Sequence, residues 1–253
     1  MLFGAGGGIS CLATTESNGG LVAYATKDTA PTVHIHDLDA PSAFVRSIPN
    51  VARARVSALA FSRDGKFLAI ASAVPDLELR VIDPRTGDEI VTTSLPYDAS
   101  ALAFNPFNAY ELIATHADAA GAASGDVPGV SVTIVDKVFE TYLIRRVAIR
   151  SEDVGVNPTS LTGAAWSPSG NAYVGTSLGG VLIVDAKTGE VTSRSASAVD
   201  GGAGPTRAFA FTKEHVFVGG GGDGVFRVYP HFDDATASTR VKPTRTVPLP
   251  GGD

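Results

Sequence analysis

Two histidines, His34 and His36, alternate along one extended apolar run of the sequence. Imidazole is a common ligand of zinc, and residues two apart on a strand point to the same face, so both rings are placed to begin a metal site. A zinc site needs three or four ligands, and no further ligand stands at an informative spacing from this pair. We therefore predict that the two histidines bind no metal.

Two glycine-rich segments have the composition of phosphate-binding loops. They are "GAGGG" (Gly4–Gly8) and "GGGGDG" (Gly219–Gly224). A phosphate-binding loop needs a helix directly after its glycines, and the nucleotide-binding version adds Lys followed by Ser or Thr. Neither segment meets these conditions, so both are predicted to be turns.

Residues for covalent or acid–base catalysis are also missing from the sequence pattern. No nucleophilic residue stands beside a residue that could act as its base, and no two carboxylates have a spacing that indicates a catalytic pair. The single cysteine, Cys11, lies in an apolar run and is predicted to be a small hydrophobic residue on a strand. We predict no catalytic residue, no cofactor-binding residue and no metal ligand, and hence that the protein is not an enzyme.

The remaining polar and aromatic candidates have structural explanations. Arg145, Arg146 and Arg150 form a small basic run on an expected outer strand, where such charges discourage pairing between exposed edges. Contact with an acidic surface of a partner is the alternative. The only tryptophan, Trp166, is expected to pack in the core where a strand enters it.

A hairpin pattern recurs along the chain, and the strands that it predicts would position the candidate residues named above. "AFSRDGKFLAIAS" (Ala60–Ser72) places a polar Asp-Gly turn between two apolar runs, and "AAWSPSGNAYVGTS" (Ala164–Ser177) repeats the arrangement. Asp and Gly favour tight turns, because Gly adopts positive φ without a Cβ clash. Runs this apolar indicate strands that are covered on both faces.

The hairpin is one part of a longer repeat. Each hairpin is followed by an apolar run that ends in Asp, at Asp37, Asp83, Asp136 and Asp185, with spacings of 46, 53 and 49 residues, and Tyr229 holds the place in a degenerate fifth copy. A further extended run follows, as in Glu89–Leu95, Thr141–Ile149 and Glu190–Ala196. Four strands in a period of about 45 residues are typical of a β-propeller blade. No segment has a sustained helical period, so almost no helix is expected.

The repeat resembles the WD40 repeat, whose third strand ends in Trp-Asp. The Asp is kept here after Ile82, Val135 and Val184, whereas the Trp is lost. The predicted fold is all-β, a WD40-type β-propeller of about five four-stranded blades, and part of a larger propeller. The expected domain is an N-terminal partial propeller over residues 1–253, with blades at about 9–50, 56–95, 99–149, 161–197 and 204–250.

Composition limits the partners and the compartment. The net charge of −6 argues against general affinity for nucleic acid or for an acidic membrane. The N-terminus lacks the basic and apolar regions of a secretory signal, no apolar run is long enough to span a bilayer, and one cysteine suits a reducing compartment. The expected location is the cytoplasm.

A second resemblance is more specific. Pro75-Asp76 before "LELRV", Phe104-Asn105-Pro106 at a blade start, and Tyr173-Val174-Gly175 followed by "VLIVD" occur in this order between Ile9 and Val228. This series resembles the large WD-repeat cilia- and flagella-associated proteins, two related proteins of the tether and tether-head complex of an inner dynein arm. The sequence departs from them in lacking the third-strand Trp and in carrying the insertion "ADAAGAASGDVPG" (Ala117–Gly129).

The resemblance implies a function and a set of partners. The function is a non-catalytic scaffold of the ciliary or flagellar axoneme that tethers an inner dynein arm motor to the doublet microtubule. The implied partners are a related WD-repeat tether protein, inner-arm dynein heavy chain, and tubulin or other doublet proteins, with no nucleic acid, membrane or cofactor.

Local physics offers simpler explanations for two of the distinctive segments. Asp76 is expected to accept backbone N–H bonds in a turn of its own loop, with partner contact as the alternative. The Ala/Gly insertion is expected to be a flexible loop, with docking as the alternative.

Two other functions remain open on the sequence. The first is a general cytosolic WD-repeat scaffold. The second is a propeller enzyme, such as a lactonase or hydrolase, which needs polar residues on the innermost strands. The runs "SALAF", "ALAF", "GAAW" and "AFAF" are apolar there, which favours a scaffold.

Overall fold

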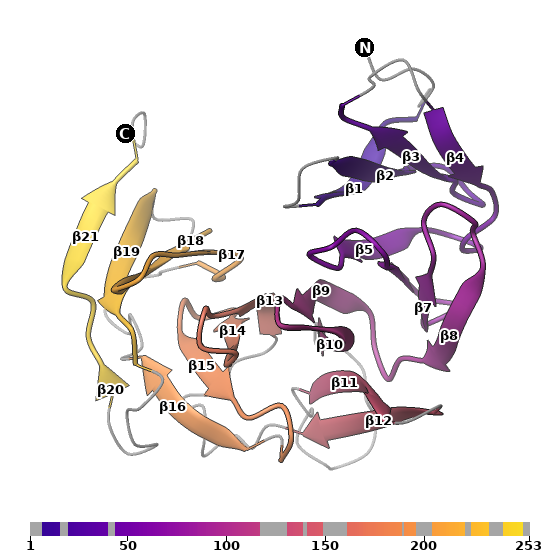
Figure 1. Ribbon diagram of the computed structural model, residues 1–253. Coiled ribbons are helices and arrows are strands. Elements are labelled where there is room, and N and C mark those ends of the chain that lie inside the picture. The colour runs from indigo at the N-terminus through magenta and orange to yellow at the C-terminus, as the bar shows by residue number, and fades with distance from the viewer. Residues whose placement is uncertain are drawn as a thin grey trace. The chain divides into compact units, whose positions relative to one another are not determined.

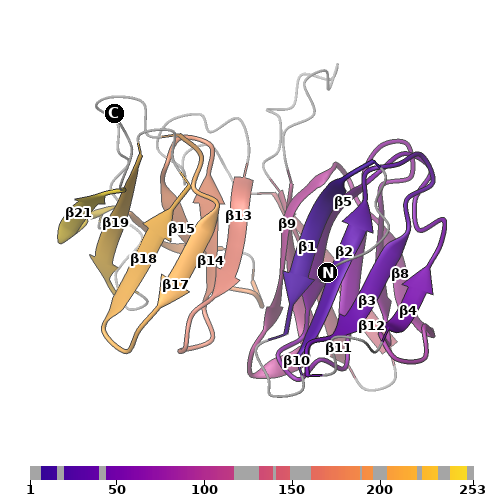
Figure 2. The same ribbon diagram turned by 90° about the horizontal axis from the view of Figure 1, so that it is seen from above.

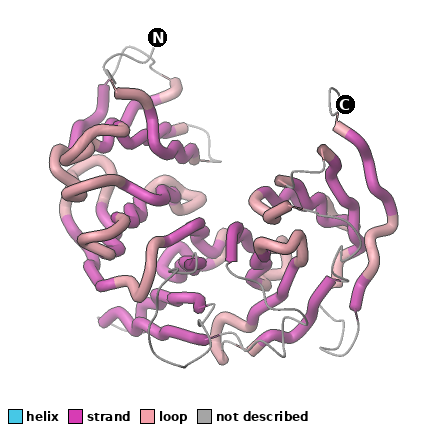
Figure 3. Tube along the Cα trace, turned by 180° about the vertical axis from the view of Figure 1, so that it is seen from behind, coloured by secondary structure: helices cyan, strands magenta, loops and turns pink. Residues whose placement is uncertain are grey.

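A computed structural model describes residues 7–15, 20–39, 44–116, 131–138, 141–148, 161–188, 190–195, 204–220, 224–232 and 240–249. Every regular element in these ranges is a β-strand, and none of the ranges contains a helix (Figure 3). The prediction of an all-β chain is confirmed.

The strands follow one another along the chain with short connections. In chain order they are β1 (Ile9–Thr14), β2 (Leu21–Thr26), β3 (Val33–Asp37), β4 (Phe44–Ile48), β5 (Val56–Phe61), β6 (Leu68–Ser72), β7 (Glu78–Ile82), β8 (Glu89–Ser94), β9 (Ala99–Asn105), β10 (Asn108–His116), β11 (Ser131–Val138), β12 (Thr141–Ala148), β13 (Leu161–Trp166), β14 (Ala172–Thr176), β15 (Val181–Val184), β16 (Val191–Ser195), β17 (Ala208–Phe211), β18 (His215–Gly219), β19 (Val225–Pro230), β20 (Arg240–Val241) and β21 (Arg245–Pro248).

These strands form five sheets, each built around four strands that are neighbours along the chain (Figure 1). The orders are β1-β2-β3-β4, β5-β6-β7-β8, β9-β10-β11-β12, β13-β14-β15-β16-β20 and β17-β18-β19-β21. Figure 2 shows the strands of the first sheet side by side. Sequential strands with hairpin connections are the arrangement of a propeller blade. The predicted four-stranded blades are confirmed.

The last two sheets depart from strict chain order. The two-residue strand β20 pairs in parallel with β16, with Arg194 opposite Arg240, and so adds a fifth strand to the fourth sheet. The outermost strand of the fifth sheet is therefore β21, which pairs antiparallel with β19. Strand β20 thus pairs with Arg194 and Ser195 at the edge of the neighbouring sheet.

The chain divides into two compact units, residues 1–112 with 135–144, and residues 113–134 with 145–253. In the first unit, β5 packs against both β1 and β9. Strand β6 is buried along its whole length, as expected for a strand covered on both faces. The main core of this unit joins the first two sheets through Leu21, Ala23, Ala25, Val33, Ile35, Val51, Ala52, Val56, Leu59, Phe61, Leu68, Ile70 and Ile82.

The core of the second unit joins the fourth and fifth sheets. Tyr173 lies at its centre and is fully buried, with the rings of Phe209, Phe211 and Phe232 arranged edge-on around it. Such edge-to-face pairs add to the free energy gained from burial alone. The side chains of the innermost strand β17 alternate between exposed and half-buried, so "AFAF" is less covered than the other inner runs.

Side-chain oxygens close the hairpin turns. Gly65 and Gly170 have φ of 69° and 87°, which confirms the turns predicted at these glycines. The buried Ser62 hydroxyl accepts the N–H of Phe67 and donates to Asp64, and Ser167 accepts the N–H of Asn171 in the same way. The hydrogen bonds from Ser62 and Lys66 outweigh the effect of burial and lower the pKa of Asp64.

The repeating aspartates have a structural role where the described side chains show one. The Asp83 carboxylate accepts the N–H groups of Arg85 and Thr86, and the Asp185 carboxylate accepts those of Lys187 and Thr188. Both aspartates therefore stabilise the turn between the third and fourth strands of a blade. The recurrence of Asp is explained by turn geometry and needs no catalytic role.

The expected core aromatic residues are buried. Phe61, Phe104 and Trp166 are each at most 9% exposed. Cys11 is half-buried and packs against the core of the first unit, as expected for a small hydrophobic residue, and burial raises the pKa of its thiol.

Candidate interaction surfaces

His34 and His36 lie on the same face of β3, as their spacing predicts, and both rings contact Tyr24 of β2. The ring centroids of His34 and His36 are 5.1 Å and 5.7 Å from that of Tyr24. The His34 Nδ1 and the Ser47 hydroxyl are within 2.6 Å of each other. Within the described ranges, no three His, Cys, Asp or Glu side chains gather into a possible metal site. The two histidines belong to an aromatic stack.

Several other candidates lie wholly or partly outside the described residues. They are Gly4–Gly6, Gly221–Gly222, Arg150, the side chains of Arg145 and Arg146, and the insertion Ala117–Gly129. Of the described glycines in the two glycine-rich segments, Gly8, Gly220 and Gly224 have positive φ, which fits turns.

The Pro75-Asp76 loop forms one wall of a polar cleft in the first unit. The cleft has a volume of about 300 Å³, and its lining residues come from the loop before β3, the segment after β4, and the loop before β7 with the start of that strand. We call it the arginine cleft, and its lining residues are Ala30, Asn50, Ala52, Arg53, Asp76, Glu78 and Arg80. Its size falls at the lower end of the range for ligand sites, enough for one or two side chains of a partner.

The sequence suggested that Asp76 closes a turn in its own loop, and this prediction is wrong. Its Oδ2 accepts the backbone N–H of Arg53 at 2.6 Å, 23 residues earlier, and its Oδ1 lies 3.2 Å from the Nε of the same arginine. Asp76 is thus bound twice by one residue of the segment that connects the first two sheets. Because Asp76 and Arg53 are 23 residues apart, the turn preferences of neighbouring residues do not predict this pairing.

Backbone strain gathers around the arginine cleft. Among the described non-glycine residues, those with positive φ are Ala30, Asn50 and Leu77, at 57°, 54° and 50°. Ala30 and Asn50 line the cleft, and Leu77 stands between the lining residues Asp76 and Glu78. A residue held in this region costs on the order of 1–3 kcal/mol, and such residues concentrate at functional sites. The strain marks the cleft as a candidate site.

Ion pairs fix the charged walls of the cleft. Arg80 donates from Nε and Nη2 to one oxygen of Glu78, at 3.1 Å and 2.6 Å. Beside the cleft, the Asp98 carboxylate pairs with Arg55 and accepts the N–H of Val74. Exposed ion pairs add little stability, so their role here is to orient the guanidinium groups.

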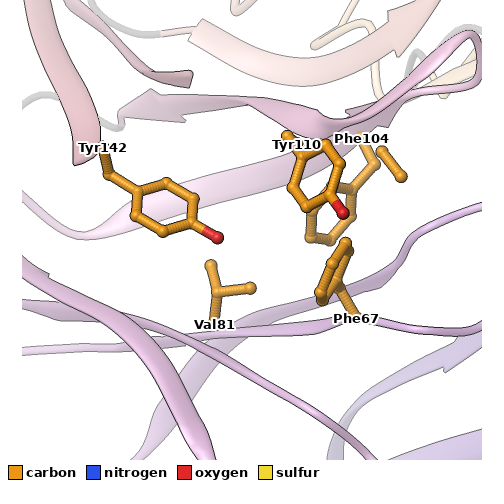
Figure 4. Close-up of a pocket in the computed structure, with 6 residues that line it drawn as sticks. Phe67, Val81, Phe104, Tyr110 and Tyr142 are labelled. Carbon is orange, nitrogen blue, oxygen red and sulfur yellow. The ribbon is translucent and has the colours of Figure 1, made fainter. Parts of the chain in front are cut away.

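A second pocket, between β7 and the third sheet, is apolar and smaller. Figure 4 shows Phe67 and Val81 facing Phe104 and Tyr110, with Tyr142 at one end and its hydroxyl directed inward. The Phe67 and Tyr110 ring centroids are 5.2 Å apart. Burial, and then the proximity of Tyr110, raises the pKa of Tyr142. The free space is only about 10 Å³, so we interpret this pocket as a packing junction between two sheets.

The described residues contain no helix that could cross a membrane. The surfaces that remain as candidates are loops and clefts at the edges of sheets, which is where β-propellers offer contacts to other molecules.

Comparison with solved structures identifies the fold. The chain is similar to the β-propeller domain of Cps50 (Swd1) from Myceliophteria thermophila, with a TM-score of 0.70 over 96% of this chain and 72% of that domain. The sequence identity is 17%, so this likeness concerns the fold alone. The chain has the fold of a WD40-type β-propeller.

Comparison with curated proteins supports the more specific resemblance. The chain is 26% identical over 228 residues to Cilia- and flagella-associated protein 43 of Chlamydomonas reinhardtii. The match covers 74% of this chain and 12% of that protein. The predicted resemblance to WD-repeat cilia- and flagella-associated proteins is confirmed. No family model matches the sequence.

Proposed function

We propose that the chain is a non-catalytic scaffold of the ciliary or flagellar axoneme, where it tethers an inner dynein arm motor to the doublet microtubule. The similarity to Cilia- and flagella-associated protein 43 carries this proposal. Of the residues that first suggested it, Asp76 lines the arginine cleft.

The architecture suits a scaffold. Four-stranded sheets with buried inner faces resist extension, while the connecting loops remain available for partners. Tyr173 and the strands around it show how tightly successive sheets pack in this chain. A tether must keep its shape while the motor changes its own, which favours packed sheets over a flexible linker.

The proposed partners follow from the same similarity. They are a related WD-repeat tether protein, the inner-arm dynein heavy chain, and tubulin or other doublet proteins. We also propose that residues 1–253 form the N-terminal part of a larger propeller, with blades at 9–50, 56–95, 99–149, 161–197 and 204–250. The match to only 12% of the relative's length is consistent with a longer polypeptide.

Deletion of the gene in the organism that encodes this chain tests the proposal. We expect cilia or flagella of normal length that bend abnormally, and a tagged copy that stays with the axoneme after detergent extraction and restores normal bending. Unchanged motility, or a tagged protein found only in the soluble cell body, would favour a general cytosolic scaffold instead.

A further inference from the structure

Two arginines of the arginine cleft keep hydrogen-bond donors available. Arg53 contacts Asp76 through its Nε, and its two terminal nitrogens make no hydrogen bond or ion pair with a described residue. Its side chain is 82% exposed, whereas the Asp76 side chain beneath it is 12% exposed. Asp76 therefore holds the Nε side of the Arg53 guanidinium group, and the two terminal nitrogens of that group remain available to a ligand.

Arg80 supplies a second partly engaged donor group on the same cleft. Its Nε and Nη2 both reach the same oxygen of Glu78, so the described contacts do not use Nη1. The side chain is one-third exposed and lines the cavity. A guanidinium fork matches a planar carboxylate with two parallel hydrogen bonds, which a lysine cannot provide.

The cleft also selects among possible anions. Asp76 and Glu78 place two negative charges beside the arginines, so a doubly charged phosphate meets more repulsion than a singly charged carboxylate. Asn50, on the same wall, carries an amide that both donates and accepts hydrogen bonds and is suited to a peptide backbone. The cavity of about 300 Å³ admits one or two side chains.

We propose that the arginine cleft binds an acidic segment of a partner protein, with a Glu or Asp carboxylate held by Arg53 and Arg80 and the adjoining backbone held by Asn50. Asp76 is a positioning residue that orients Arg53. This inference deepens the proposed scaffold function by assigning it one contact surface, and it rests on that function for the identity of the partner.

Binding of labelled peptides to the 253-residue chain tests the proposal. The probes are a fluorescein-labelled hexaglutamate peptide, a hexaglutamine peptide, and a peptide of the same length with one phosphoserine among glutamines, each measured by fluorescence anisotropy at low and at physiological salt. We expect binding of the glutamate peptide, weakened by salt, with the glutamine peptide at least tenfold weaker.

Variants locate the binding in the cleft. Arg53→Gln should weaken binding of the glutamate peptide at least tenfold. Arg53→Lys should have an intermediate effect, because lysine keeps the positive charge but cannot donate two parallel hydrogen bonds to a carboxylate. Arg63→Gln is the matched control, since Arg63 is exposed in the turn after β5 and the substitution removes the same charge. It should change the affinity less than twofold. Because Arg53 is mostly exposed, its variants should fold normally, which circular dichroism would check.

Several results would overturn the proposal. They are equal binding of the glutamine peptide, equal weakening by Arg53→Gln and Arg63→Gln, and no detectable binding of the glutamate peptide. Tighter binding of the phosphoserine peptide would replace the proposed ligand by a phosphopeptide. The scaffold function is judged separately, because axonemal location in cells does not depend on any of these peptide results.

Discussion

His34 links the stability of the first sheet to pH. Burial, and then the positive charge of His36, lowers the pKa of His34 below its usual value of about 6.5. The unfolded chain therefore binds more protons than the folded chain between the two pKa values. The free energy of unfolding should fall as the pH falls through this window and should be fully retained above it.

The measurement is the midpoint of thermal unfolding between pH 7.5 and pH 5. The wild-type protein should lose more stability on acidification than His34→Gln does, and His36→Gln should reduce the loss by removing the repelling charge. If wild type and His34→Gln lose stability in parallel, the pKa of His34 is not lowered in the folded protein.

Single residues of the candidate site differ in how visible they are from sequence. Pro75-Asp76 stood out because the resemblance marked it, and the spacing of His34 and His36 correctly placed both on one face. The positive φ of Ala30 and of Leu77 could not be predicted from the sequence, because these residue types normally avoid positive φ. The pairing of Asp76 with Arg53 depends on how two loops meet, and local turn chemistry does not encode that.

At the scale of the elements, the segment before β17 crosses closely over the fourth sheet. The backbone N–H of Thr206 donates to the carbonyl oxygen of Thr176, and the carbonyl oxygen of Thr206 accepts a hydrogen bond from the hydroxyl of Thr162. This approach requires Gly175, because a Cβ there would stand 2.4 Å from the carbonyl oxygen of Thr206. The glycine that formed part of the recognised sequence pattern is thus explained by packing.

Alanine substitution distinguishes this glycine from its equivalent in the next hairpin. Gly175→Ala should lower the free energy of unfolding by about 1–3 kcal/mol through overpacking. Gly219→Ala should change it by less than about 0.5 kcal/mol, since the nearest atom to a Cβ there is 3.9 Å away. Urea unfolding of both variants gives the comparison. Equal effects would mean that the segment at Thr206 does not lie against the sheet.

The packing of inner strands makes a second prediction at this scale. Phe61 is 9% exposed in the core of the first unit, whereas Phe107 is 62% exposed in the turn between β9 and β10. Phe61→Ala should therefore destabilise by about 3–5 kcal/mol. Phe107→Ala should cost less than about 0.5 kcal/mol. A loss below about 1 kcal/mol for Phe61→Ala, again in urea, would show that the register of β5 is wrong.

The hairpins were predictable because their signals are local. Asp-Gly and Ser-Gly turns between apolar runs specified β5 with β6 and β13 with β14, and the glycines adopt the expected positive φ. Strand β20 was not predictable, because Arg240–Val241 is short and polar on one side and exists only by pairing with β16. Its formation depends on tertiary contact, which propensity does not report.

For the whole molecule, the repeat period was enough to predict a propeller, because each copy contains four strands and a turn signal. The sheets and the likeness to a solved β-propeller confirm this fold. The proposed function was not derivable from residue chemistry, since a scaffold needs no catalytic residues. It depended on an ordered series of blade features, which the match to Cilia- and flagella-associated protein 43 then supported.

The central claim is that this chain holds an inner dynein arm motor in place on the axoneme. Electron cryo-tomography with subtomogram averaging, on axonemes from wild-type cells and from cells that lack the gene, tests it most directly. We predict that the deletion removes density between the doublet microtubule and the head of one inner dynein arm, that this head is displaced, and that reintroducing the gene restores both. Averages that superimpose without any difference at the inner dynein arms would contradict the account.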